Sequence, residues 1–415
     1  MWKVTEAAMG LVIQVRPRGV QLKRDIRAHL ASLGFTRDSS GGLLLPGSGK
    51  QVVRQLHEPQ RLSVISRQSE LIVKRLPKLQ HHFASGGDVD VAKISPYLER
   101  IYSDTWQADL FKLASLSWSV PVSSGFGRRL RFLVWDKHND KLIGLVAIGD
   151  PVFNLAVRDK FLGWSGTDRK ERLVNLMDAY VLGAVPPYNM LLGGKLVASL
   201  LRTTEIYEEF ARAYGSLPGI ISKQAKSARL LAITTSSSMG RSSVYNRLRV
   251  HDTHYLKSVG FSGGWGHFHV PDELFTSMRA HLREIGHEYA DYHAFGQGSN
   301  WRIRTIRAAM TDLGFRGDML KHGIQREVFV SLLADNSIEL LSTGIGSPVL
   351  SSLKSVAEVG GIARERWVVP RAASRPDYEG WTNDNWRTLV HENLSHAETR
   401  LGPSSVSPSY QAVSG

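Results

Sequence analysis

The chain has 415 residues and no cysteine, and its 42% hydrophobic and 22% charged residues are typical of a globular protein. This length predicts two or three domains, and the missing cysteine excludes disulfides, thiolate zinc sites, iron–sulfur clusters and a cysteine nucleophile. No apolar run reaches the ~18 residues that a membrane span needs, and the first residues lack a signal-peptide pattern. We therefore expect a cytoplasmic protein without a membrane partner.

Positive charge is unevenly distributed along the chain. The formal net charge is +14, and residues 1–90 hold fourteen Lys and Arg against seven Asp and Glu. Residues 210–251 hold seven basic residues and no acidic one. This asymmetry favours a polyanionic partner, most simply DNA or RNA. A merely basic surface is the alternative.

Residues 1–90 are predicted to form a small basic helical domain. The segment LKRDIRAHLASLGF (22–35) has the apolar spacing of an amphipathic helix, and SELIVKRLPKL (69–79) is a second helical or extended piece. Together they favour a helix-turn-helix-like module, with a helical cap on the next domain as the alternative. Residues 86–90 are predicted to be a linker.

Residues 91–345 are predicted to form an α/β core of the α+β type with a mixed sheet. A β-hairpin is expected from RLRFLVWD (129–136) and KLIGLVAIGD (141–150). Further strands are expected at 179–185, 228–235, 255–261, 267–270 and 327–334. Helices are expected at about 168–177, from Gly193, at 204–214, near 243–248, at 271–286 and at 299–314. Residues 346–415 are predicted to be an extension whose tail, from about Pro370, is flexible or loosely docked.

The order of these elements resembles the GCN5-related N-acetyltransferases. In that family, backbone N–H groups at a helix start hold the pyrophosphate of acyl-CoA. Here Leu192-Gly193-Gly194-Lys195 stands in that place, and Asn246, Tyr255 and Gly260-Phe261 match the family's later signature. The resemblance implies an acetyltransferase-like core, either with acyl-CoA as a cofactor or with the architecture retained and that binding lost.

A second resemblance covers about residues 20–345. Four segments carry it in order: GAVPPYNMLLGGKLVASL (183–200), TTSSSMGRSSVYNRLR (234–249), YLKSVGFSGGWGHFHV (255–270) and SNWRIRTIRAAMTDLGF (299–315). Their wording resembles the DruA family of the Druantia anti-phage systems. The resemblance implies a prokaryotic defence component encoded beside a large helicase-like partner, and it implies no settled reaction.

A phosphate-binding turn is predicted where an apolar strand ends at Pro186. The candidate residues are Asn189, Gly193, Gly194 and Lys195, because glycines allow close approach of an anion to backbone N–H groups and lysine adds a cation. Alternatively, the two glycines let the helix pack closely on the sheet.

Nucleic-acid contacts are predicted from a polar loop and a basic helix. Ser and Asn donate to phosphate oxygens while Arg neutralises charge. A capped structural loop is the alternative. A nucleophilic serine is disfavoured, because this stretch lacks the G-x-S-x-G motif of serine hydrolases. The candidate residues are Arg229, Arg241, Ser242, Ser243, Tyr245, Asn246, Arg247, Arg302, Arg304 and Arg307.

Two catalytic candidates follow from the acetyltransferase resemblance and from a histidine pair. Tyr255 is a candidate general acid, because a phenol can protonate a leaving thiolate, and packing is its alternative role. His267 and His269 share one strand face, but no obvious third metal ligand accompanies them, so His267 is a candidate general base or a structural residue.

Two hypotheses therefore stand. The chain is either a nucleic-acid-binding defence subunit that works with a helicase, or an active acyltransferase that modifies a base, nucleotide or protein.

Overall fold

The structure, a computed structural model, describes residues 17–37, 39, 43–44, 47, 49–123, 125–216, 228–263, 269–291, 301–315 and 324–401. The chain divides into a small unit, Met1–Gly47 with Gly266–His322, and a large unit, Ser48–Trp265 with Gly323–Gly415. The small unit is discontinuous in sequence because its second segment packs with the N-terminal helix. The predicted domain boundaries at residues 90 and 345 both fall inside the large unit.

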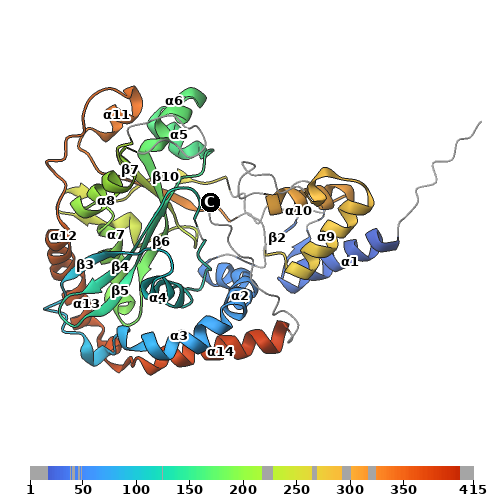
Figure 1. The fold of residues 1–415 in the computed structure, drawn as a ribbon, viewed down its shortest axis with the longest axis horizontal. Coiled ribbons are helices and arrows are strands. Elements are labelled where there is room, and N and C mark those ends of the chain that lie inside the picture. Colours follow the sequence, from blue (N-terminus) through green and yellow to red (C-terminus); the bar gives the residue numbers. More distant parts are fainter. Residues whose placement is uncertain are drawn as a thin grey trace, which may run out of the picture. The chain divides into compact units, whose positions relative to one another are not determined.

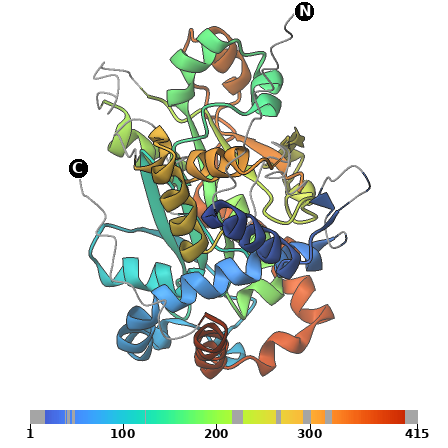
Figure 2. The ribbon, with the colours of Figure 1, turned by 90° about the vertical axis from the view of Figure 1, so that its right-hand side faces the viewer.

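The small unit is built on helices (Figure 2). Its described elements are α1 (Pro17–Ser32), α9 (Asp272–Glu284), α10 (Trp301–Asp312) and the antiparallel pair β1 (Thr36–Arg37) and β2 (Leu43–Leu44). Ile26, Met278 and Ile306 are almost fully buried, one from each helix. The predicted amphipathic helix is therefore confirmed, and Gly34 follows it with a positive φ of 84°.

A mixed sheet forms the centre of the large unit (Figure 1). Among the described residues it has the strand order β10-β11-β7-β6-β5-β4-β3, with β6 and β7 parallel and the other neighbours antiparallel. The hairpin predicted at 129–150 is confirmed as β4 and β5. The bounds are β3 (Pro96–Arg100), β4 (Arg129–Asp136), β5 (Lys141–Gly149), β6 (Leu176–Ala184), β7 (Ala232–Ser236), β10 (Lys257–Phe261) and β11 (Glu327–Leu332), with a separate small pair β8 (Arg249–Val250) and β9 (Thr253–His254).

Apolar side chains alternate between the two faces of this sheet. Phe132 and Val134 of β4 pack into one core with Leu196 and Phe210, whereas Leu133 and Trp135 pack into a second core with Leu76 and Trp386. The helices are α2 (Lys50–Arg67), α3 (Ser69–Leu79), α4 (Trp106–Ser115), α5 (Ala156–Leu162), α6 (Gly166–Arg172), α7 (Gly193–Ser199), α8 (Thr204–Tyr214), α11 (Ser337–Thr343), α12 (Val356–Ala363), α13 (Val369–Ser374) and α14 (Asp384–Leu401). No helix in the described part of the chain is long and apolar enough to cross a membrane.

The C-terminal segment corrects the expectation of a loose tail from Pro370. Residues up to Leu401 include α13 and α14, and α14 lies along α2 and α3 (Figure 1). Trp386 is fully buried and its ring stacks on Phe83 at 3.9 Å between centroids. The segment is docked because its tryptophan completes a core built by residues far away in the sequence. Residues 402–415 lie outside the described residues.

Pairing between β6 and β7 covers only part of β6. The register joins Leu176–Asp178 to Ala232–Thr234, after which β6 continues to Ala184. Beyond this register, side-chain hydroxyls bond backbone carbonyls of β6: the Thr235 hydroxyl of β7 donates to the Ala179 carbonyl at 2.9 Å, and the Tyr245 hydroxyl donates to the Leu182 carbonyl at 3.4 Å. Beyond Asp178, hydroxyl groups thus replace part of the ladder on this edge of β6.

Candidate functional site

A buried carboxylate holds the loop between β7 and β8. Glu327 is 4% exposed and accepts hydrogen bonds from the Ser242 backbone N–H (3.0 Å), Asn246 Nδ2 (2.8 Å) and the Ser258 hydroxyl (2.9 Å). The polar groups of this loop that face Glu327 are therefore engaged inside the protein. Exposed side chains of the same loop are Arg241, Ser243 and Arg247.

Tyr245, another predicted nucleic-acid contact, turns into the sheet. Its ring packs edge-on against Phe329, and its hydroxyl donates to the Leu182 carbonyl. Desolvation raises the pKa of the Tyr245 phenol to about 12. This tyrosine fills the space beside β6 and fixes the loop, which leaves Arg247 at the surface.

The two glycines at the start of α7 have different surroundings. A Cβ added at Gly193 would lie 2.5 Å from the Tyr188 carbonyl oxygen, whereas a Cβ added at Gly194 would meet nothing within 4 Å. Gly193 therefore supports close packing of helix on sheet, and Gly194 leaves open space at the helix start. Leu192 precedes them with a φ of 58°, and Asn189 is exposed.

Two arginines from other segments of the chain act electrostatically on Lys195. Its Nζ lies 5.3 Å above the ring of Trp367, and its pKa is lowered by desolvation and then by the charges of Arg247 and Arg366. Arg247 and Arg366 are exposed. None of the three cations forms an ion pair with a carboxylate among the residues that the structure describes.

We call Lys195, Arg247 and Arg366 the basic cluster. The charges of Arg247 and Arg366 both act on Lys195, so an anion that binds beside Lys195 gains more than it would at a single lysine. The cluster joins two residues that the sequence singled out separately, Lys195 and Arg247. The sequence analysis did not single out Arg366, which lies in a π-helical turn (Arg364–Val368) more than a hundred residues away from Lys195 and Arg247 in the chain.

The remaining predicted contacts are dispersed. Arg229 is half-buried and donates to the Gly346 carbonyl at 2.6 Å. In the small unit, Arg302 is engaged by the Val270 carbonyl (2.7 Å) and by Asp272 (2.9 Å). Arg304 and Arg307 are exposed on α10. Within the large unit, no described contact joins Arg229 to the basic cluster, and the other three arginines belong to the small unit.

Of the two catalytic candidates, the structure describes only Tyr255. Tyr255 is 2% exposed, and the guanidinium of Arg202 lies 5.3 Å from its ring centroid. Desolvation raises the pKa of its phenol. This placement fits a packing role, since a general acid has to contact its substrate. His267 lies outside the described residues.

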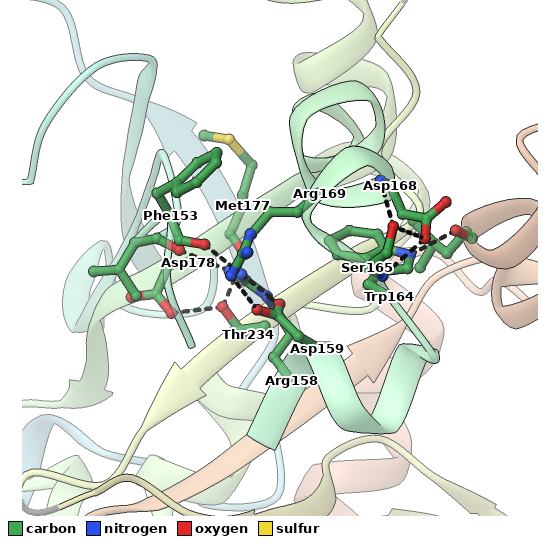
Figure 3. Close-up of polar contacts among 12 residues, drawn as sticks. Phe153, Arg158, Asp159, Trp164, Ser165, Asp168, Arg169, Met177, Asp178 and Thr234 are labelled. Carbon is green, nitrogen blue, oxygen red and sulfur yellow. Dashed lines mark hydrogen bonds and ion pairs between the residues drawn. The ribbon is translucent and has the colours of Figure 1, made fainter. Parts of the chain in front are cut away.

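A second polar site, missed by the sequence reasoning, surrounds Asp178 on β6 (Figure 3). Thr234 donates to Oδ1 of Asp178 at 2.6 Å, and Oδ2 accepts no hydrogen bond from any described residue. Desolvation raises the pKa of the Asp178 carboxyl to about 6, against the opposing effects of Thr234 and Arg158. A carboxyl perturbed in this way marks a candidate functional group.

Arg158 organises the surroundings of Asp178 (Figure 3). Its fully buried guanidinium donates to Asp159 Oδ1 (2.7 and 2.9 Å) and to the carbonyls of Val152 (2.7 Å) and Phe153 (2.8 Å). Arg169 closes the network by donating to Asp159 Oδ2 at 2.8 Å. These contacts use four of the five N–H groups of Arg158, and its charge acts on Asp178 although the structure describes no hydrogen bond between the two residues.

The fold and these sites define a class: an α/β protein with a mixed sheet, an unpaired basic cluster and a desolvated carboxyl on the sheet. Residues 48–343 match the family model described as Druantia protein DruA. The chain is also 58% identical over 371 residues to "Druantia protein DruA" of Escherichia coli (strain UMEA 4076-1), which covers 89% of this chain and 92% of that protein.

The chain therefore belongs to the DruA family, and DruA is a component of Druantia anti-phage defence. No solved structure matches the chain. The acetyltransferase-like core therefore stays a prediction.

Proposed function

We propose that this DruA-family protein is a nucleic-acid-binding component of a Druantia-type defence system, which acts with a helicase-like protein of the same operon. The observation that carries the proposal is the basic cluster, whose three cations come from α7, the loop after β7 and the turn after α12. The charges of Arg247 and Arg366 act on Lys195, and no described carboxylate pairs with any of the three. The phosphates of a nucleic-acid backbone supply the compensating charge.

The surroundings of the cluster support this proposal. The chain carries a net charge of +14, so long-range electrostatics favour the approach of a polyanion. The loop that holds Arg247 is fixed by Glu327, which limits the ordering cost of binding. Gly194 leaves space beside Lys195 in which a phosphate oxygen fits.

Fluorescence anisotropy against labelled single- and double-stranded oligonucleotides at several salt concentrations tests the proposal. The triple variant Lys195→Gln/Arg247→Gln/Arg366→Gln should bind at least about tenfold more weakly and lose about one unit of salt slope per cation. The matched control is Lys74→Gln, which removes an exposed lysine already paired with Glu70. If the triple variant keeps wild-type affinity and slope, or if the wild type binds neither oligonucleotide at low salt, the proposal is wrong.

The helicase partnership is tested in cells. Phage protection should require both the gene for this chain and its helicase-like neighbour, because nucleic-acid binding by itself supplies no work. Full protection by this gene alone would contradict the partnership without affecting the binding proposal.

An acyltransferase activity is the second candidate function. The order hairpin, β6, glycine-started α7 and β7, on which the resemblance rests, favours it. Calorimetry with acetyl-CoA tests it: binding that Gly194→Val removes without lowering the melting temperature would support this function, and no binding by the wild type would exclude it.

A further inference from the structure

Two polar groups of β6, on Asp178 and on Tyr180 two residues further along the strand, have no hydrogen-bond partner among the described residues. One is Oδ2 of Asp178, and the other is the Tyr180 hydroxyl, which is buried and forms no hydrogen bond with any residue that the structure describes. Gly149 of β5 pairs in register with Asp178, and a Cβ at Gly149 would lie 3.1 Å from the Tyr180 ring. The Tyr180 side chain therefore lies over the cross-strand neighbour of Asp178. A buried hydroxyl left unpaired is costly, and a ligand that pairs with the Tyr180 hydroxyl recovers that cost.

Two exposed phenylalanines have their backbone carbonyls close to the residues that surround these two groups. Phe153 is 47% exposed, and its carbonyl is held by Arg158, whose charge acts on Asp178. The Arg169 guanidinium lies 4.9 Å from the Phe153 ring centroid. Phe126 is 41% exposed, and its carbonyl oxygen lies 3.5 Å from the Cβ position of Gly149. Large apolar side chains that are exposed beside unsatisfied polar groups are typical of a ligand surface.

Positive charge accompanies the same surface. The charges of Arg131 and Arg129 act on the Tyr180 phenol and oppose the rise in its pKa that desolvation causes. A ligand here thus meets one carboxyl oxygen, one hydroxyl, two exposed phenylalanine rings and nearby guanidinium groups.

We propose that the Asp178–Tyr180 surface binds an unstacked nucleobase of the nucleic acid, an inference that rests on the proposed function. Every base carries an N–H donor beside an acceptor on its edge, which suits a carboxylate oxygen next to a hydroxyl. The base plane stacks on Phe153 or Phe126, and Arg129 and Arg131 face the adjoining phosphates. The basic cluster then binds backbone, and this surface recognises the presence of a base.

The test compares a single-stranded oligonucleotide with an abasic strand of the same length and charge. We expect wild type to prefer the base-containing strand by about tenfold, which is within the range for stacking of one base. Asp178→Asn, Tyr180→Phe and Phe153→Ala should each reduce this preference, while binding to the abasic strand stays unchanged. Lys195→Gln should weaken binding to both strands by the same factor.

The outcomes separate the two proposals. If wild type binds the base-containing and the abasic strand equally well, or if all three variants keep the wild-type preference, the nucleobase site is overturned and phosphate binding is left intact. If wild type binds neither strand, the proposed function is overturned and this inference with it. Tyr180→Phe removes only a hydroxyl that has no partner among the described residues, so this variant should fold. Lys160→Ala on the exposed side of α5 is the control.

Discussion

The carboxyl group of Asp178 and the hydroxyl group of Thr234 meet at the last paired position of β6 and β7, with 2.6 Å between Oδ1 and Oγ1. One oxygen of the carboxylate is thereby fixed in direction, and the other is left for a ligand. The hydrogen bond lowers the pKa of Asp178, but desolvation outweighs it. The sheet thus holds a charged group at the point where strand pairing stops.

Stability should depend on pH through Asp178. Its folded-state pKa of about 6 lies above the ordinary value of 3.8, so the folded protein binds a proton that the unfolded chain has already lost. The resulting stabilisation is present below the ordinary pKa and is lost as pH rises through about 6. Asp178→Asn should flatten this dependence and raise the free energy of unfolding at neutral pH by about 1–3 kcal/mol. Urea unfolding across this pH window measures it, and equal slopes in both proteins would contradict it.

The adjacent glycines Gly193 and Gly194 should respond differently to alanine. Gly193→Ala places a Cβ against the Tyr188 carbonyl and should cost about 1–3 kcal/mol of stability through overpacking. Gly194→Ala meets open space in a helix, so it should leave the melting temperature unchanged or raise it slightly. Thermal unfolding of the pair measures this difference. Equal destabilisation of both variants would show that the helix start is packed on both sides.

Local sequence patterns predicted much of the fold but little of the site. The hairpin, the strand before Pro186 and the helix from Gly193 follow from alternation and turn residues within short windows. Ser242 and Asn246 were predicted to face a ligand, yet both contact Glu327, which lies more than eighty residues further along the chain. A single sequence gives no sign of such a pairing.

Long-range contacts also explain the other differences. The segment after Pro370 has the composition of a loose tail, but Trp386 finds its partner in Phe83. Arg366 joins Lys195 only after α12 folds back on α7. Asp178 was not singled out because an aspartate inside an apolar strand belongs to no short motif, although a lone acidic residue there is itself a signal of function.

Removal of the Glu327 charge should loosen the loop that presents Arg247. In wild type, N–H donors bond the Glu327 carboxylate; in Glu327→Gln an amide NH2 group would face some of these donors. We therefore expect the free energy of unfolding to fall by about 1–3 kcal/mol. Nucleic-acid affinity should fall while the salt slope stays close to that of wild type, because all three cations remain. Anisotropy and thermal unfolding measure both effects. Ser243→Ala, on the exposed side of the same loop, should change neither, and a parallel loss of slope in Glu327→Gln would point to a direct role in binding.

Replacement of Arg158 by lysine should separate the two sites of the protein. A lysine ammonium keeps the charge but cannot reach Asp159 and the carbonyls of Val152 and Phe153 together, since these contacts use the planar fork of the guanidinium. Leaving buried acceptors without donors should cost about 2–4 kcal/mol, measured by urea unfolding. In the folded fraction, the preference for base-containing strands should fall because Phe153 is no longer held, whereas binding to abasic strands should persist through the basic cluster. Lys160→Ala should match wild type in both measurements, and an unchanged base preference in Arg158→Lys would show that Phe153 does not depend on this contact.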